Sequence, residues 1–282
     1  MWLIKFLRKI RRHLLHYDPS IKIFISKARL AENLKEYQKI YPKLLFAPVF
    51  KCNGYGHGLV QVAEILDKEN IAFFVVDSLP EAIILRNNGI KSEILIIGHT
   101  KPENVKNSKL SGVAFTITSP EQLEGVSKTI LSKVKIHLKI DTGMHRQGIL
   151  PGQISKSIEI IKSNKFLNLV GICSHFADAD GDNETFTKLQ IEEWKKIVLQ
   201  FKKEFQAIKF FHIAATAGTF FNDQSSGNVA RLGIGLYGVN PSPLSKLNLK
   251  PVLQMQSVIS SLRQLEAEEY VGYNITYKTK QD

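Results

Sequence analysis

The feature that most constrains this chain is a regular alternation of short apolar, β-rich runs with helix-like segments. Eight such runs occur, at residues 44–50, 71–77, 93–98, 113–118, 134–141, 169–175, 209–215 and 229–238. Near-continuous apolar strands that alternate with helices are typical of parallel strands covered by helices on the outside. Eight of these units within about 200 residues favour a closed, TIM-type (β/α)8 barrel over an open doubly wound sheet.

The segments that flank this repeat follow other patterns. A strand at 21–26 and a helix at 28–41 are predicted, and we expect both to lie in a different layer from the barrel. After Pro251, short alternating runs without an amphipathic helix predict antiparallel strands. So few strands do not form an independent β domain. We therefore expect that they pack on the barrel or on another chain, or that the polypeptide is truncated. The predicted domains are a basic amphipathic segment at 1–18, the barrel at 19–243 and the beginning of a mostly antiparallel β domain at 244–282.

Composition narrows the classes of function. A hydrophobic content of 44% with 23% charged residues excludes disordered, collagen-like and low-complexity chains. The only cysteines, Cys52 and Cys173, cannot form a disulfide framework, which indicates a reducing compartment, and we expect the cytoplasm. The net charge of +12 permits anionic ligands without defining a fold. We expect a small-molecule ligand and no nucleic acid.

Residues 1–16 have apolar side chains at helical spacing with basic residues between them and no acid. Because the charges interrupt the apolar segment, the pattern is not that of a secretory signal. One interpretation is a helix that lies on an anionic membrane surface. The other, which we favour because so short a pattern specifies little, is a terminal helix packed on its own domain or on a partner.

Candidate chemistry in a barrel is sought at the carboxyl ends of the strands. Lys51 leaves an apolar strand for a glycine-rich loop, where a lysine either acts as an amine nucleophile or simply reaches solvent. A dinucleotide fingerprint fails in this loop because Leu59 stands where a small residue is needed. A calcium loop from Asp178 fails as well, since its sixth position is Asn183 and its twelfth is Leu189. We predict no metal site.

Several segments, in order along the chain, resemble the alanine racemases, a family that binds pyridoxal 5′-phosphate (PLP). KCNGYGHG at 51–58 is similar to that family's lysine motif, KIDTGMHRQGI at 139–149 to its central arginine motif, and SHFADAD at 174–180 to its histidine motif. Further similar segments are HIAATAG (212–218), RLGIGLYGVNP (231–241), LKPVL (249–253) and VGYNITY (271–277). The resemblance covers roughly residues 20 to 280, and it implies a PLP-binding barrel followed by a β domain.

The resemblance also implies roles for individual residues. Lys51 would hold PLP and serve as one proton-transfer base, and Tyr273 would be the opposite base, acting in the partner's site of a homodimer. The expected cofactor contacts are Tyr55, Thr216, Gly233 and Ile234 at the phosphate, Arg231 at the pyridine nitrogen and His175 behind Arg231. Arg146 would lie near the substrate carboxylate and the phenolic oxygen, and Lys139 matches a lysine that is carbamylated in some members.

The chain departs from the family pattern in several places. Ala215 replaces a usual asparagine, His145 a usual glycine and Leu232 a usual proline. The family's β domain also continues well beyond Tyr273, through a Gly-Tyr-Ala-Asp-Gly segment that is absent here. If these residues are the whole protein, we expect part of the site entry and of the dimer contact to be missing, and activity to be weak or absent.

Three functions follow from these expectations. The first is an alanine racemase that supplies D-alanine for peptidoglycan. The second is a related racemase for serine or another amino acid. The third is a truncated barrel that holds PLP without turnover.

Overall fold

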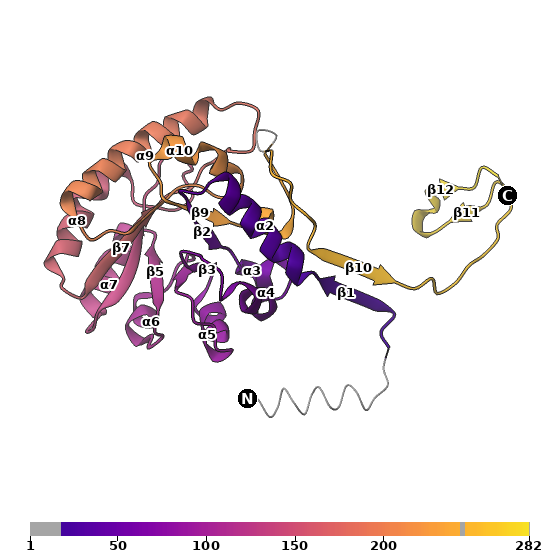
Figure 1. Ribbon diagram of the computed structural model, residues 1–282, viewed down its shortest axis with the longest axis horizontal. Helices are drawn as coiled ribbons and strands as arrows, with labels where there is room; N and C mark the ends of the chain where they lie inside the picture. The colour runs from indigo at the N-terminus through magenta and orange to yellow at the C-terminus, as the bar shows by residue number, and fades with distance from the viewer. Residues whose placement is uncertain (1–17, 243–245, 282) are drawn as a thin grey trace. The chain divides into compact units, whose positions relative to one another are not determined.

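The computed structural model describes residues 18–242 and 246–281 and divides them into two compact units (Figure 1). The larger unit is Ile25–Leu253, and the smaller one combines the described residues before and after it. The predicted amphipathic segment at 1–16 lies outside the described residues. The boundaries predicted at 18 and 243 stay predictions.

Eight parallel strands form the centre of the larger unit. They are β2 (Leu45–Pro48), β3 (Phe74–Val76), β4 (Ile94–Ile96), β5 (Val113–Ile117), β6 (Val134–Lys139), β7 (Leu167–Cys173), β8 (Phe210–His212) and β9 (Val229–Leu232). Strands β3 to β8 pair in chain order, and β2 pairs with β9. Single bridges between Val49 and Val75 and between Ala215 and Arg231 join these two sheets, so the ring closes as predicted.

Helices cover the outside of this ring (Figure 1). They are α2 (Lys27–Ile40), α4 (Leu59–Leu66), α5 (Leu79–Asn87), α6 (Pro102–Asn107), α7 (Pro120–Thr129), α8 (Ile154–Ser163), α9 (Thr185–Glu204) and α10 (Asn222–Ser225). Helix α7 begins where the sequence predicts it, because the Ser119 hydroxyl accepts a hydrogen bond from the Gln122 amide and Pro120 occupies the first turn.

Helix α2 corrects one expectation. Its buried residues Leu30, Leu34 and Tyr37 recur at helical spacing and belong to the main hydrophobic core. The ring of Tyr37 packs against Phe46 of β2, with ring centroids 5.9 Å apart. The prediction that this helix lies in a different layer from the barrel was therefore wrong.

Side chains alternate along each strand between the interior of the barrel and the helices, because the strand period is two. On β3, Phe74 and Val76 join the large core beneath the helices. Val75, and Phe73 just before the strand, join a small cluster of buried residues near the strands. On β6 the same alternation assigns Ile136 and Leu138 to the helix side. The other face of β6 carries ionisable residues, namely Lys135, His137 and Lys139.

The smaller unit contains short strands, of which β1 and β10 each have one terminal residue, Ile25 or Leu253, in the larger unit. Strand β1 (Ile21–Ile25) pairs with β10 (Leu253–Ser257), and β11 (Tyr270–Val271) pairs with β12 (Tyr277–Lys278). The second pair is antiparallel, as predicted, and encloses the 3-10 turn η4 (Tyr273–Ile275). Within the described part of the chain, no helix is long and apolar enough to span a bilayer.

Candidate active site

The cavity nearest the predicted chemistry lies at the carboxyl ends of the barrel strands and has a volume of about 310 Å³. Seven of the nine predicted site residues line it: Lys51, Tyr55, His175, Thr216, Arg231, Gly233 and Ile234. A smaller hollow of about 70 Å³ shares Lys51, His175 and Arg231, and its walls include Lys139 and Arg146. The barrel therefore gathers eight of the nine residues around one region.

The loop that carries Lys51 has an uncommon backbone. Lys51 begins the short helical turn α3 (Lys51–Tyr55), and the next five residues all have positive φ, from 52° at Tyr55 to 84° at Gly56. Left-handed backbone costs roughly 1–2 kcal/mol for a residue with a Cβ, so surrounding contacts must hold it. The Asn53 side chain accepts from the Leu59 amide at 2.8 Å, which ties the turn to the start of α4.

A carboxylate on α5 supports the same loop. Glu81 accepts from the Cys52 amide at 2.9 Å with one oxygen and from the Asp77 amide at 2.7 Å with the other. The loops after β2 and β3 are thereby joined. This arrangement leaves Lys51 and Tyr55 on the cavity wall, with Lys51 Nζ 5.9 Å from the centre of the Tyr55 ring.

Arg231 is the penultimate residue of β9, and its guanidinium is buried. Its terminal nitrogens donate to the backbone oxygens of His212, Ser174 and Ile213 at 2.8 to 2.9 Å. Nη1 also donates to Nδ1 of His212 at 2.5 Å, and Nη2 lies 3.0 Å from Nδ1 of His175, so the two Nη2 hydrogens are shared among three acceptors. Among the hydrogen bonds of the described residues, the Nε hydrogen has no acceptor, so Arg231 keeps one donor available at the cavity that it lines.

Arg231 is a buried cation whose hydrogen-bond partners are neutral groups. Burial, followed by the nearby Arg231 charge, lowers the pKa of His175 to about 3 and that of His212 well below its usual range. Both imidazoles are therefore neutral acceptors at pH 7. Burial lowers the pKa of Arg231 as well, but a guanidinium stays protonated in proteins. Among the described residues, no carboxylate pairs with the Arg231 guanidinium. The charge therefore favours a ligand atom that accepts a hydrogen bond.

A second part of the cavity is built from small groups. The Thr216 hydroxyl oxygen accepts from the Gly233 amide at 3.1 Å and from the Gly235 amide at 3.3 Å, so its own hydrogen can be donated elsewhere. A Cβ at Gly233 would lie 2.7 Å from the Tyr55 hydroxyl oxygen. Because Gly233 has no side chain, the Tyr55 hydroxyl can approach the backbone closely, and hydroxyl groups gather in this part of the cavity.

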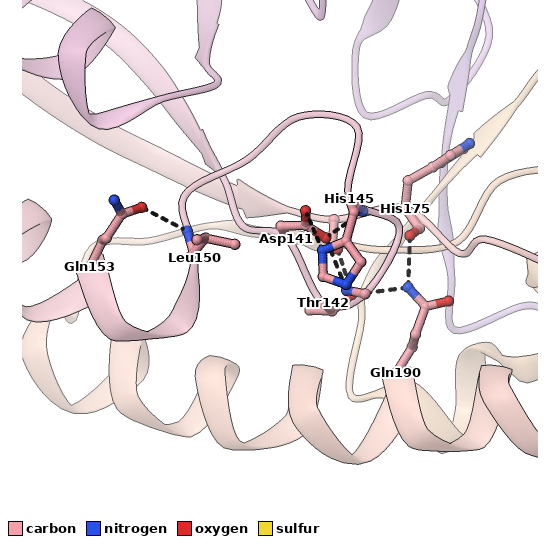
Figure 2. Close-up of polar contacts among 9 residues, drawn as sticks. Asp141, Thr142, His145, Leu150, Gln153, His175 and Gln190 are labelled. Atoms are coloured by element: carbon pink, nitrogen blue, oxygen red, sulfur yellow. Dashed lines mark hydrogen bonds and ion pairs between the residues drawn. The ribbon is translucent and has the colours of Figure 1, made fainter.

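The loop after β6 carries Arg146, whose side chain is exposed. Asp141 organises this loop, because its carboxylate accepts from the amides of Gly143 at 2.9 Å and His145 at 3.1 Å. The same carboxylate lies 3.3 Å from the His145 imidazole (Figure 2). His145 has φ of 52°, a left-handed value that suits the glycine usual at this position.

Lys139 stands at the end of β6, where its Nζ donates to Gln147 at 3.3 Å. Burial, and then the neighbouring Arg231 and Arg146 charges, lower the pKa of this lysine. Its positive charge is therefore disfavoured here.

Gln190 of α9 was not predicted as a site residue. Its amide nitrogen donates to the His175 backbone oxygen at 3.1 Å and to the Thr142 hydroxyl at 3.2 Å (Figure 2). Its amide oxygen accepts from the Ala177 backbone at 2.9 Å. Gln190 therefore joins Thr142, in the loop after β6, to His175 and Ala177, in the loop after β7.

His212 and His137 were missed too. His212 is the first residue of the HIAATAG segment, and His137 lies among alternating apolar and polar residues on β6. The alternation of side chains along each strand, with a period of two residues, was the signal that could have placed both histidines in the barrel interior.

Tyr273, the ninth predicted residue, belongs to the smaller unit. It begins η4, and its side chain is 97% exposed.

Comparison with known proteins gives a consistent result. Residues 25–241 match the model of the family described as "Alanine racemase, N-terminal domain". The chain belongs to the alanine racemase family. An alanine racemase from Fusobacterium nucleatum is 36% identical over 265 residues, which cover 92% of this chain and 72% of that protein. This membership places the chain among the amino-acid racemases, as predicted.

Solved structures show the same fold. The crystal structure of alanine racemase from E. faecalis matches with a TM-score of 0.85 at 28% identity, covering 94% of this chain and 73% of that one. A histidine racemase from Leuconostoc mesenteroides matches with a TM-score of 0.79 at 24% identity, covering 93% and 72%. The fold itself therefore occurs in proteins named for different amino acids.

Proposed function

We propose that this chain binds PLP and interconverts L-alanine and D-alanine by moving a proton at Cα. The observation that carries the proposal is the meeting of Lys51 and Arg231 at one cavity, beside the space bordered by Tyr55, Thr216 and Gly233. The family membership supports it.

PLP fits the groups that line this cavity. Its phosphate needs hydrogen-bond donors and room, and the space beside Gly233 offers the Tyr55 and Thr216 hydroxyls. A pyridine nitrogen needs a donor, and the Nε hydrogen of Arg231 has no other acceptor among the described residues. Lys51, on the same cavity wall, supplies the amine that would hold the aldehyde. When bound, PLP withdraws electron density from the amino acid Cα and so makes its proton removable.

The protein's own contribution is to hold two bases on opposite faces of Cα, because removal and return from one side cannot invert configuration. We assign Lys51 Nζ to one face. We assign the Tyr273 hydroxyl of a partner subunit to the other, in a homodimer. Arg146 would pair with the substrate carboxylate.

Arg231 has a further role in this proposal. A guanidinium can only donate, so Arg231 would leave a ring nitrogen held against it without a proton. Such a cofactor would withdraw less charge, and this would favour return of the proton to Cα. His175, His212 and three backbone oxygens keep Arg231 in position for this role.

We further propose that the product D-alanine serves peptidoglycan synthesis and that the enzyme works in the cytoplasm. Both cysteines are unpaired in the structure, which suits a reducing compartment. A racemase for another amino acid is the second candidate, because the fold also occurs in a protein titled histidine racemase.

The test is purification of the chain, measurement of the visible absorbance of bound PLP, and incubation with L-alanine in deuterated water. We expect D-alanine labelled at Cα, with serine and histidine exchanging more slowly. Lys51→Ala should lower the rate on the order of a thousandfold, since it removes both a base and the cofactor's attachment. Lys43→Ala, at an exposed lysine that precedes β2 and does not line the cavity, should not change it.

PLP absorbance without exchange would identify a cofactor-binding barrel that does not turn over. Absence of bound PLP in the wild-type chain would overturn the proposal.

A further inference from the structure

A chain of polar side chains runs through the interior of the barrel away from the candidate active site. Nη1 of Arg231 lies 2.5 Å from Nδ1 of His212, and Nε2 of His212 lies 2.8 Å from Nδ1 of His137. Both histidines are buried, with 0% and 1% of their surfaces exposed.

The positions of the protons in this chain follow from Arg231. Because a guanidinium only donates, His212 Nδ1 must accept, and the single proton of the neutral ring is on Nε2. That proton is donated to His137 Nδ1, so His137 carries its own proton on Nε2. Burial, and then Arg231, lower the pKa of His137 to about 3, which keeps the ring neutral. Among the described residues, the Nε2 hydrogen of His137 has no acceptor.

His137 lines a second cavity, of about 350 Å³, at the amino-terminal ends of the barrel strands. We call it the basal cavity. Its inner wall is aromatic, because Phe73 meets His137 edge-on at 5.4 Å and Phe210 stacks on it at 5.8 Å with a 14° interplanar angle. The apolar side chains Leu95 and Val170 also line it.

The backbone makes room for this histidine. The pairing of β6 with β7 shifts between Ile136 and His137, and Gly171 lies opposite His137. A Cβ at Gly171 would lie 2.5 Å from the imidazole. The ring is thus held against β7 at the cavity wall by the absence of a side chain.

The mouth of the basal cavity is positively charged. Lys135 pairs with Glu93 at 2.7 Å, whereas Lys209 has no carboxylate partner among the ion pairs of the described residues. A ligand in this cavity therefore meets a deep hydrogen-bond donor, flat aromatic walls and an unbalanced cation at the rim.

We propose that the basal cavity binds a small aromatic carboxylate whose ring carries a hydrogen-bond acceptor. The ring would lie against Phe73 and Phe210, its acceptor would take the Nε2 hydrogen of His137, and its carboxylate would face Lys209. A volume of 350 Å³ holds about twelve non-hydrogen atoms at the roughly 30 Å³ that a water molecule occupies.

The test uses three probes of matched size on the full chain saturated with PLP, so that the probes cannot occupy the cofactor's site. Nicotinate has the ring acceptor and the carboxylate, benzoate lacks the acceptor, and nicotinamide lacks the charge. By calorimetry we expect nicotinate to bind at least tenfold more tightly than either. Nitrogen NMR should show the His137 Nε2 signal moving as nicotinate is added.

Two variants locate the binding. Ala207→Trp fills the cavity mouth from an exposed position and should abolish binding, whereas Leu199→Trp, on the exposed face of α9, should not change it. His137→Phe keeps a flat ring without the donor and should make nicotinate and benzoate bind equally. Unsaturable binding of nicotinate, or equal binding by the Ala207→Trp variant, would overturn the proposal. Neither readout requires racemase activity.

Discussion

At the scale of single residues, the buried guanidinium of Arg231 determines which groups around it can carry a charge. Arg231 has no carboxylate partner among the described residues, and its contacts are carbonyl oxygens and neutral imidazoles. Charge-assisted hydrogen bonds to such acceptors offset part of the loss of hydration. The arrangement depends on His212 and His137 staying neutral, since a second cation beside Arg231 would be repelled.

This dependence predicts how stability changes with pH. An unfolded histidine has a pKa of about 6.5, whereas burial and Arg231 lower the pKa of folded His137 to about 3. Between these values the unfolded chain binds a proton that the folded chain does not, so the free energy of unfolding falls as pH decreases. Each such histidine contributes up to about 1.4 kcal/mol per pH unit.

Urea denaturation across this pH window measures the effect. His137→Phe should reduce the slope of stability against pH, whereas substitution of the exposed His99 by glutamine should leave it unchanged. An identical slope in His137→Phe and in the wild type would contradict the prediction.

A second prediction at this scale concerns His145. Its φ of 52° is strained for any residue with a Cβ, and its imidazole contact with Asp141 involves a side chain that is 76% exposed. We expect His145→Gly to raise the free energy of unfolding by about 0.5–1 kcal/mol, because relief of strain outweighs the lost contact. The control is His145→Ala, which removes the imidazole but keeps the Cβ. A gain in His145→Ala equal to that in His145→Gly would show that strain is not the cause.

At the scale of elements, the loop after β2 holds the candidate site in place. Its left-handed residues are stabilised from two helices, by the Leu59 amide of α4 and by Glu81 of α5. Such backbone is found where surrounding contacts over-determine it, and functional sites are common examples. The loop after β7 is held in a similar way by Gln190 of α9.

Asn53 tests this view of the loop. Asn53→Ala removes the acceptor for the Leu59 amide and puts a less tolerant residue at φ 57°, so we expect a loss of about 2 kcal/mol of stability. Asn53→Gly loses the same acceptor but adopts the backbone freely, and it should cost less. Thermal unfolding of both variants compares the two contributions. Equal losses would mean that the backbone conformation carries no strain.

At the scale of the whole molecule, the predicted racemase needs groups from both compact units. Lys51 belongs to the barrel unit, and Tyr273 belongs to the smaller unit, with an exposed side chain. If Tyr273 serves the partner's site, each site is built from two chains, as in an isologous dimer. A dimer of one chain inactivated at Lys51 and one chain inactivated at Tyr273 would then contain one intact site.

We therefore expect activity to return when Lys51→Ala and Tyr273→Phe chains are mixed under conditions that exchange subunits. Random pairing makes half of the dimers mixed, each with one intact site, which gives about a quarter of the wild-type rate. The assay is racemisation of L-alanine before and after exchange. No return of activity in verified mixed dimers would place both residues in the site of a single chain.

Much of the fold could be predicted from local pattern. Eight apolar runs gave the eight parallel strands, because a strand buried on both faces must be apolar and must return through a helix. The beginning of α7 followed from Ser119 and Pro120, whose effects are local. Helix α2 was misplaced because periodicity identifies an apolar face without identifying the surface that it covers.

The sequence by itself determined the motifs at Lys51, Arg146, His175 and Arg231 and the order in which the barrel presents them. Only the tertiary structure decided that Gln190 holds the loops around His175, that His137, His212 and Arg231 form one hydrogen-bonded chain, and that His137 faces a basal cavity. The physical reason is that strand and helix periods are short-range properties of the chain. Contacts between residues 75 positions apart, such as His137 and His212, exist only after the ring of strands has closed.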